Sequence, residues 1–179
     1  LTASLVYGNQ TLAQLEKAEK SRPKVRIAVI QGNIDQAVKW DRRFQVGTLE
    51  TYERLARVAA AERPAPIVWP ETALPFFLRY EAELGARVHR FVAETGIPML
   101  IGSPDAGTDR RLYNSEFLLG ADGRIQARYD KRHLVPFGEY VPLQSIFFFL
   151  DKLVVGIGDF GRGRAATVFP LDGGRFSVM

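Results

Sequence analysis

The chain has 179 residues with a hydrophobic share of 46% and a charged share of 25%, proportions of a folded domain that exclude a disordered chain. Its net charge of +4 comes from Lys and Arg residues that are scattered along the chain. Without a continuous basic patch, nucleic-acid binding is not expected, whereas mild attraction to anionic lipid head groups is compatible with this charge. Because the sequence has no cysteine and only two histidines, we expect no disulfide, no metal site and no cofactor.

The first 22 residues are polar and rich in Ala and Leu, with Leu5, Leu12 and Leu15 at roughly helical spacing. After them, short apolar runs alternate with longer amphipathic stretches. The expected elements are, in chain order, a buried strand at 25–30, a helix at 41–62 with Asp41 as N-cap, a strand at 66–69, a helix at 81–95 with Gly96 as C-cap, a strand at 98–101, a hairpin of 112–119 and 124–129, and a second hairpin of 167–169 and 175–179.

The order of these elements, β-α-β-α-β followed by β-β, predicts an α/β fold in which helices cover a sheet that antiparallel strands extend. The helix at 41–62 is expected to face the core, since its apolar positions share one side. Those positions are Phe44, Thr48, Tyr52, Leu55 and Ala59.

Both ends of the chain indicate a piece of a longer protein. The sequence starts at Leu1 without a signal peptide and ends within the strand-like run 175–179. No apolar run is long enough to cross a bilayer. We therefore expect residues 1–22 to be a linker from an upstream membrane segment, and residues 23–179 to be a truncated domain.

Glu71 and Lys131 each follow a predicted strand, so both are expected at the same edge of the sheet, where such folds place their chemistry. Glu71 lies between a buried strand and an apolar run. An ionised carboxylate there must be paired or have a raised pKa, and can then act as a general base. A desolvated Lys131 can stabilise a developing oxyanion. The alternatives are a solvated loop carboxylate and a surface cation.

The segment 129–142, YDKRHLVPFGEYVP, carries Lys131 and Glu139 on one irregular loop, because Pro136, Gly138 and Pro142 interrupt any helix. Glu139 is expected to pair with Lys131 or with Arg132.

Two aromatic features are candidates for substrate contact. Trp40 lies between a strand end and a helix start, where it either packs in the fold or forms a wall of the substrate pocket. Phe147 and Phe148 belong to the apolar run 146–150. This run is either core or an exposed flap that contacts a membrane surface or an acyl chain.

Three motifs together resemble the nitrilase superfamily of carbon–nitrogen hydrolases. They are VIQGNIDQ at 29–36 with Lys39 and Trp40 after it, WPETA at 69–73, and the segment 129–142. The third motif is the specific one, and it is similar to the bacterial inner-membrane acyltransferases of this superfamily that complete lipoproteins. The resemblance covers about residues 24–179 and implies a nitrilase-like α-β-β-α sandwich, incomplete at its C-terminus.

The resemblance implies a Glu–Lys–Cys triad in which Glu71 is the general base, Lys131 stabilises the tetrahedral intermediate and Glu139 supports the site. Trp40 corresponds to a tryptophan of the substrate pocket. The implied activity transfers an acyl group from a phospholipid donor, through a Cys thioester, to an apolipoprotein acceptor on the periplasmic side of the bacterial inner membrane. The Cys would follow residue 179, so the chain by itself is expected to be inactive.

Two other function classes stay open. One is a soluble carbon–nitrogen amidase that acts on small amides, against which the aromatic run and the upstream linker weigh. The other is a non-catalytic relative that only binds lipid or protein, against which the unfinished C-terminal strand weighs.

Overall fold

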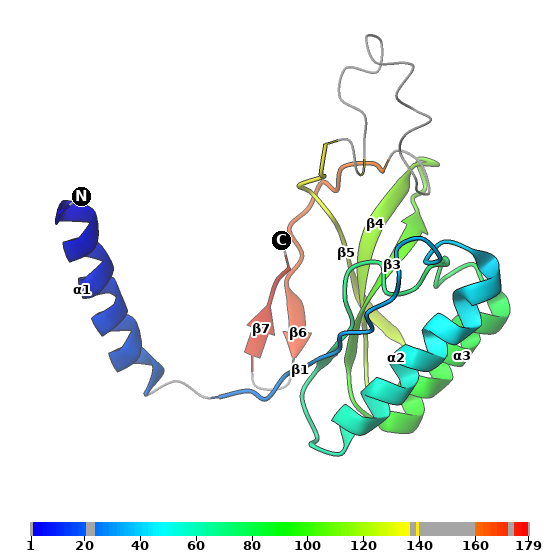
Figure 1. Cartoon of the computed structure of the whole chain (residues 1–179), viewed down its shortest axis with the longest axis horizontal. Coiled ribbons are helices and arrows are strands. Elements are labelled where there is room, and N and C mark those ends of the chain that lie inside the picture. The colour runs from blue at the N-terminus through cyan, green and yellow to red at the C-terminus, as the bar shows by residue number, and fades with distance from the viewer. Residues whose placement is uncertain (1, 21–23, 137–138, 140–159, 172–173, 179) are drawn as a thin grey trace, which may run out of the picture.

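The computed structural model describes residues 2–20, 24–136, 139, 160–171 and 174–178. Its centre is a five-stranded sheet in which the strands follow the order β1-β2-β3-β4-β5 (Figure 1). The first three strands run parallel, β4 is antiparallel to β3, and β5 is antiparallel to β4, so β5 runs in the same direction as the first three strands. The strands are β1 (Ala28–Val29), β2 (Ile67–Val68), β3 (Met99–Ala106), β4 (Leu112–Leu119) and β5 (Ile125–Asp130).

Two helices, α2 (Gln45–Ala60) and α3 (Ala82–Thr95), lie side by side on one face of this sheet (Figure 1). A short 3-10 helix, η1 (Arg42–Phe44), leads into α2, and the side chain of Asp41 accepts a hydrogen bond from the backbone N–H of Arg43 at its start. Helix α3 ends at Gly96, which adopts the left-handed conformation with φ 64°. The Gly96 cap is therefore confirmed, whereas Asp41 caps η1 and not α2, whose own N-cap residue is Phe44.

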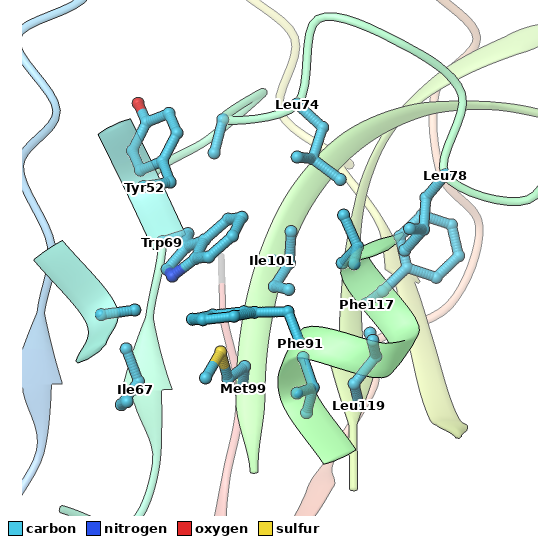
Figure 2. Packing of buried hydrophobic residues seen from close by; sticks show 14 of the residues in the cluster. Tyr52, Ile67, Trp69, Leu74, Leu78, Phe91, Met99, Ile101, Phe117 and Leu119 are labelled. Atoms are coloured by element: carbon cyan, nitrogen blue, oxygen red, sulfur yellow. The ribbon is translucent and has the colours of Figure 1, made fainter. Parts of the chain in front are cut away.

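The main core lies between the helices and the sheet, and Trp69 is at its centre (Figure 2). The indole ring stacks on Tyr52 with 5.2 Å between the ring centroids and packs against Phe91 at 6.2 Å. Since Trp69 is 1% exposed, it anchors the chain directly before Pro70 and Glu71. The core thus fixes where the loop after β2 begins.

A second apolar cluster covers the opposite face of the sheet. Its main contribution from outside the sheet is Phe169, in the hairpin of β6 (Phe169–Leu171) and β7 (Gly174–Phe176). Phe169 is fully buried against residues of β3, β4 and β5, namely Leu100, Leu118 and Tyr129. The first part of β3 and the last part of β4 are therefore apolar on both faces, which explains the hydrophobic runs at 99–101 and 117–119.

Helix α1 (Thr2–Glu19) stands apart from the sheet and contributes no buried residue (Figure 1). Among the described residues, no helix combines the length and the hydropathy needed to cross a bilayer. The role of residues 1–22 as a linker stays a prediction.

The predicted α/β fold and the order of its elements are confirmed, but two details of burial were wrong. The strand expected at 25–30 is reduced to β1, and Ile27 and Val29 are 53% and 74% exposed. The reason is that β1 is an edge strand with a neighbour on one side only. Phe44 is 45% exposed because it belongs to η1 and not to the buried face of α2.

Candidate active site

The loop after β2 turns sharply at Thr72 and directs Glu71 away from the core. Thr72 has φ 48°, and the flanking N–H groups of Ala73 and Leu74 donate to Pro70 O and Gly102 O, each at 3.0 Å. The Glu71 side chain is 53% exposed as a result. The carboxylate is therefore half-exposed and yet paired with Lys131, and the apolar residues after it are buried.

Lys131 directly follows β5 and joins two carboxylates. Its Nζ lies 2.9 Å from Glu71 Oε1 and 3.1 Å from Glu139 Oε2. The Lys131 side chain is 19% exposed, and its backbone N–H donates to Asn114 O at 2.8 Å. The structure therefore brings the three residues predicted to be catalytic into one cluster.

Asn114 in β4 completes this cluster, and the sequence did not point to it. Its side-chain Nδ2 donates to Glu71 Oε1 at 2.5 Å and to Glu139 Oε1 at 2.7 Å. The side-chain carboxylate of Glu139 also accepts from the backbone N–H of Val135 at 2.7 Å. Glu139 is thus held from three sides, while Glu71 keeps one carboxylate oxygen, Oε2, outside these hydrogen bonds.

Opposing effects set the protonation of Lys131 and Glu139. Burial lowers the pKa of Lys131, but the hydrogen bonds and charges of Glu71 and Glu139 outweigh it, so this pKa lies above its usual value. Burial raises the pKa of Glu139, but the Val135 N–H, the Asn114 amide and Lys131 bring it below its usual value. At neutral pH the site therefore holds an ammonium flanked by carboxylates, which can stabilise an oxyanion and accept a proton.

A cavity of about 440 Å³ opens on the other side of Glu71 and is lined by Lys39, Tyr52 and the loop at 29–34. The Lys39 ammonium donates to Thr72 Oγ1 at 2.7 Å. Burial lowers the pKa of Lys39, and the charge of Glu71 offsets part of this effect. In the sequence Lys39 was only part of a motif. The structure shows that it binds the side chain of Thr72, the residue after Glu71.

The candidate substrate-binding residues differ in what the structure says of them. Trp40 is part-buried, and its ring centroid lies 5.5 Å from Lys39 Nζ. Its role in a substrate pocket stays a prediction. Phe147, Phe148 and the whole run 146–150 lie outside the described residues. Within the described part of the chain, no group of His, Asp and Glu residues could hold a metal ion.

Gly102 in β3 is the position on which the Glu71 loop rests, and its replacement by Ala should move that loop. A Cβ atom there would lie 2.5 Å from Pro70 O and Thr72 N and 2.9 Å from Glu71 C. Backbone atoms cannot give way as side chains do, so we expect Gly102→Ala to lower the free energy of unfolding by about 1–3 kcal/mol. Chemical denaturation measures this loss. Gly47→Ala is the matched control, since a Cβ at Gly47 meets nothing within 4 Å, and a Gly102→Ala protein as stable as this control would contradict the prediction.

Comparison with known proteins places the chain in a family. The carbon-nitrogen hydrolase family matches residues 26–179. An apolipoprotein N-acyltransferase of Geobacter metallireducens is 40% identical over 100% of this chain and 34% of its own length. A protein of the same name from Allorhizobium ampelinum is 37% identical over 90% of the chain and 32% of its own length. The chain thus spans about a third of the curated relatives that it matches.

Solved structures support the same fold. An amidase from Nesterenkonia sp. superposes with a TM-score of 0.61 at 16% identity, over 86% of this chain and 54% of the amidase. A CN-hydrolase superfamily protein from Xanthomonas campestris superposes with a TM-score of 0.58 at 20% identity, over 86% of this chain and 51% of its own. At these identities the likeness concerns the fold alone.

Proposed function

The chain belongs to the carbon-nitrogen hydrolase family, and we propose that it is the catalytic region of an enzyme that transfers an acyl group from a phospholipid to the α-amino group of an apolipoprotein. The observation that carries this proposal is the Lys131 ammonium held between Glu71 and Glu139. The names of the relatives from Geobacter metallireducens and Allorhizobium ampelinum supply the substrate class.

In the first half of the proposed reaction, a cysteine thiol attacks the ester carbonyl of the phospholipid. Glu71 accepts the thiol proton, and Lys131 stabilises the negative charge on the carbonyl oxygen. The C–O bond then breaks, Glu71 returns the proton to the departing lysophospholipid oxygen, and the acyl group stays on sulfur as a thioester. Glu139 and Asn114 do not react; they hold Lys131 and Glu71 at hydrogen-bonding distance.

In the second half, the acceptor amine attacks the thioester carbonyl. Glu71 takes a proton from the amine, Lys131 again stabilises the oxyanion, and the C–S bond breaks to leave an amide. The proton returns to the thiolate, so the enzyme ends as it began. A single base and a single cation therefore serve both halves, as a two-step exchange requires.

The 179 residues contain no cysteine, so the proposed thiol belongs to the whole protein outside these residues. The Nesterenkonia amidase that shares the fold has an active-site cysteine. We further propose that the whole protein works at the bacterial inner membrane with this region on the periplasmic side, since its acyl donor is a membrane phospholipid.

The test compares the whole protein with this chain alone. With a phospholipid and a lipopeptide that bears a free α-amino group, the whole protein should form the amide and a lysophospholipid, which mass spectrometry detects. The chain alone should form neither, because Glu and Lys side chains do not replace a thiolate as acyl carrier. Acyl transfer by the chain alone would contradict the thioester route. Hydrolysis of small amides by the whole protein without acyl transfer would favour an amidase instead.

A further inference from the structure

Glu116 in β4 is an acidic residue near the Glu71–Lys131–Glu139 cluster that the proposed mechanism does not use. Side chains two apart on a strand share a face, so Glu116 lies on the same face as Asn114, which contacts Glu71 and Glu139. The residue directly opposite on β3 is Gly102, and the one opposite on β5 is Tyr129.

The glycine opposite Glu116 is where the catalytic loop rests on the sheet. The space that a Gly102 Cβ would fill is taken by backbone atoms of Pro70, Glu71 and Thr72. Residues opposite each other on antiparallel strands have Cβ atoms about 4.5–5.5 Å apart. The Glu116 side chain therefore lies beside the backbone of the residue that serves as general base.

The carboxyl group of Glu116 lacks the partners that the other two acidic residues have. Its Oε2 is enclosed and has no hydrogen-bond partner among the described residues. Lys131 contacts Glu71 and Glu139 instead, and the neighbouring residues on the sheet, Asn114 and Tyr129, supply no ammonium or guanidinium group. An ionised carboxylate without a partner is costly in such a place.

The protonation of Glu116 follows from this geometry. Burial, with a further contribution from the charge of Glu71, raises the pKa of Glu116 to about 8. At neutral pH the group is therefore mainly a neutral carboxylic acid. The two ammonium groups of Lys39 and Lys131 are then balanced by the two carboxylates of Glu71 and Glu139.

We propose that Glu116 is a positioning residue for the Glu71–Lys131 pair, and that its neutral carboxylic acid keeps a third negative charge out of the active site. When Glu116 ionises, its negative charge repels the negative charge of the oxyanion. It also cancels part of the positive potential by which the Lys131 ammonium stabilises that oxyanion. Glu116 thereby sets the alkaline limit of activity. The kinetic effect of this role rests on the proposed acyl transfer.

The kinetic test compares Glu116→Gln with wild type in the whole protein. Glutamine keeps the shape of the neutral acid and cannot ionise. The acceptor amine titrates in the same pH range, but it does so equally for both proteins and cancels in the ratio of their kcat/KM values. Whatever its value at neutral pH, the ratio of variant to wild type should rise about tenfold by about pH 9. A ratio that stays constant over this range would overturn the proposal, and Glu94→Gln on the exposed side of α3 should give such a constant ratio.

A second measurement tests the protonation of Glu116 independently of acyl transfer. The side-chain carboxyl of Glu116 can be followed by NMR in this chain, with Glu116→Gln to assign its signal. The signal should titrate with a midpoint near 8, whereas an exposed Glu titrates near about 4.3. A low midpoint would overturn the role of Glu116 even if acyl transfer is observed. If the midpoint is high but the whole protein does not transfer an acyl group, the environment of Glu116 is as proposed and the proposed function is refuted instead.

Discussion

Replacing Lys131 by Ala, or Glu71 by Gln, in the whole protein should lower the kcat of acyl transfer about 10²–10³-fold. The Lys131 ammonium is the cation at hydrogen-bonding distance from both Glu71 and Glu139. Its removal takes away the charge that stabilises the oxyanion and leaves two carboxylates facing each other without a cation. Glu71→Gln keeps the hydrogen bond from Asn114 available but cannot accept the thiol proton.

The loss should appear in the first half of the reaction. No lysophospholipid should be released in a burst, and no thioester should accumulate. Lys24→Ala and Glu94→Gln are matched controls, because both residues are exposed, and both variants should keep wild-type rates. Near-normal turnover of Lys131→Ala with an unchanged fold would mean that Lys131 is a surface cation and that the catalytic assignment is wrong.

Local signals in the sequence predicted much of the fold. Gly96 marks the end of α3, and Gly123, with φ 76°, forms the turn between β4 and β5. These positions require a backbone conformation that glycine adopts without strain, so one residue suffices to locate them. The strand pattern placed Glu71 directly after β2 and Lys131 directly after β5. The rule that active sites lie at the carboxyl ends of strands then predicted that the two side chains meet. The sequence could therefore predict this pair before any distance was known.

The sequence could not predict the contacts that depend on which strands become neighbours. Asn114 is 43 residues from Glu71, and its role follows only from the pairing of β3 with β4. Glu116 has an ordinary strand position, and only the glycine opposite it reveals that the loop carrying Glu71 packs beside it. The exposure of Val29 likewise depends on β1 being an edge strand.

The sequence also did not predict a buried network of ion pairs on the helix-covered side of the sheet. Asp105 in β3 is fully buried and accepts hydrogen bonds from Arg79 at 2.6 and 3.0 Å. It also pairs with Arg128 in β5, which in turn contacts Asp130 at 2.7 Å. Because Lys131 follows Asp130 directly, this network holds together the strand ends from which Lys131 projects.

Asp105→Asn should therefore lower the free energy of unfolding by about 3–5 kcal/mol, as expected when one partner of a buried ion pair is removed. The substitution keeps the size of the side chain but leaves two part-exposed arginines facing a neutral amide at a fully buried position. Glu62→Gln is the matched control, since the Arg26–Glu62 pair has side chains 68% and 76% exposed and should contribute less than about 1 kcal/mol. Urea denaturation of this chain compares the two variants. Equal small losses in both would show that Asp105 does not hold the sheet, and the placement of Lys131 would then rest on the backbone hydrogen bond to Asn114 and on its two carboxylate partners.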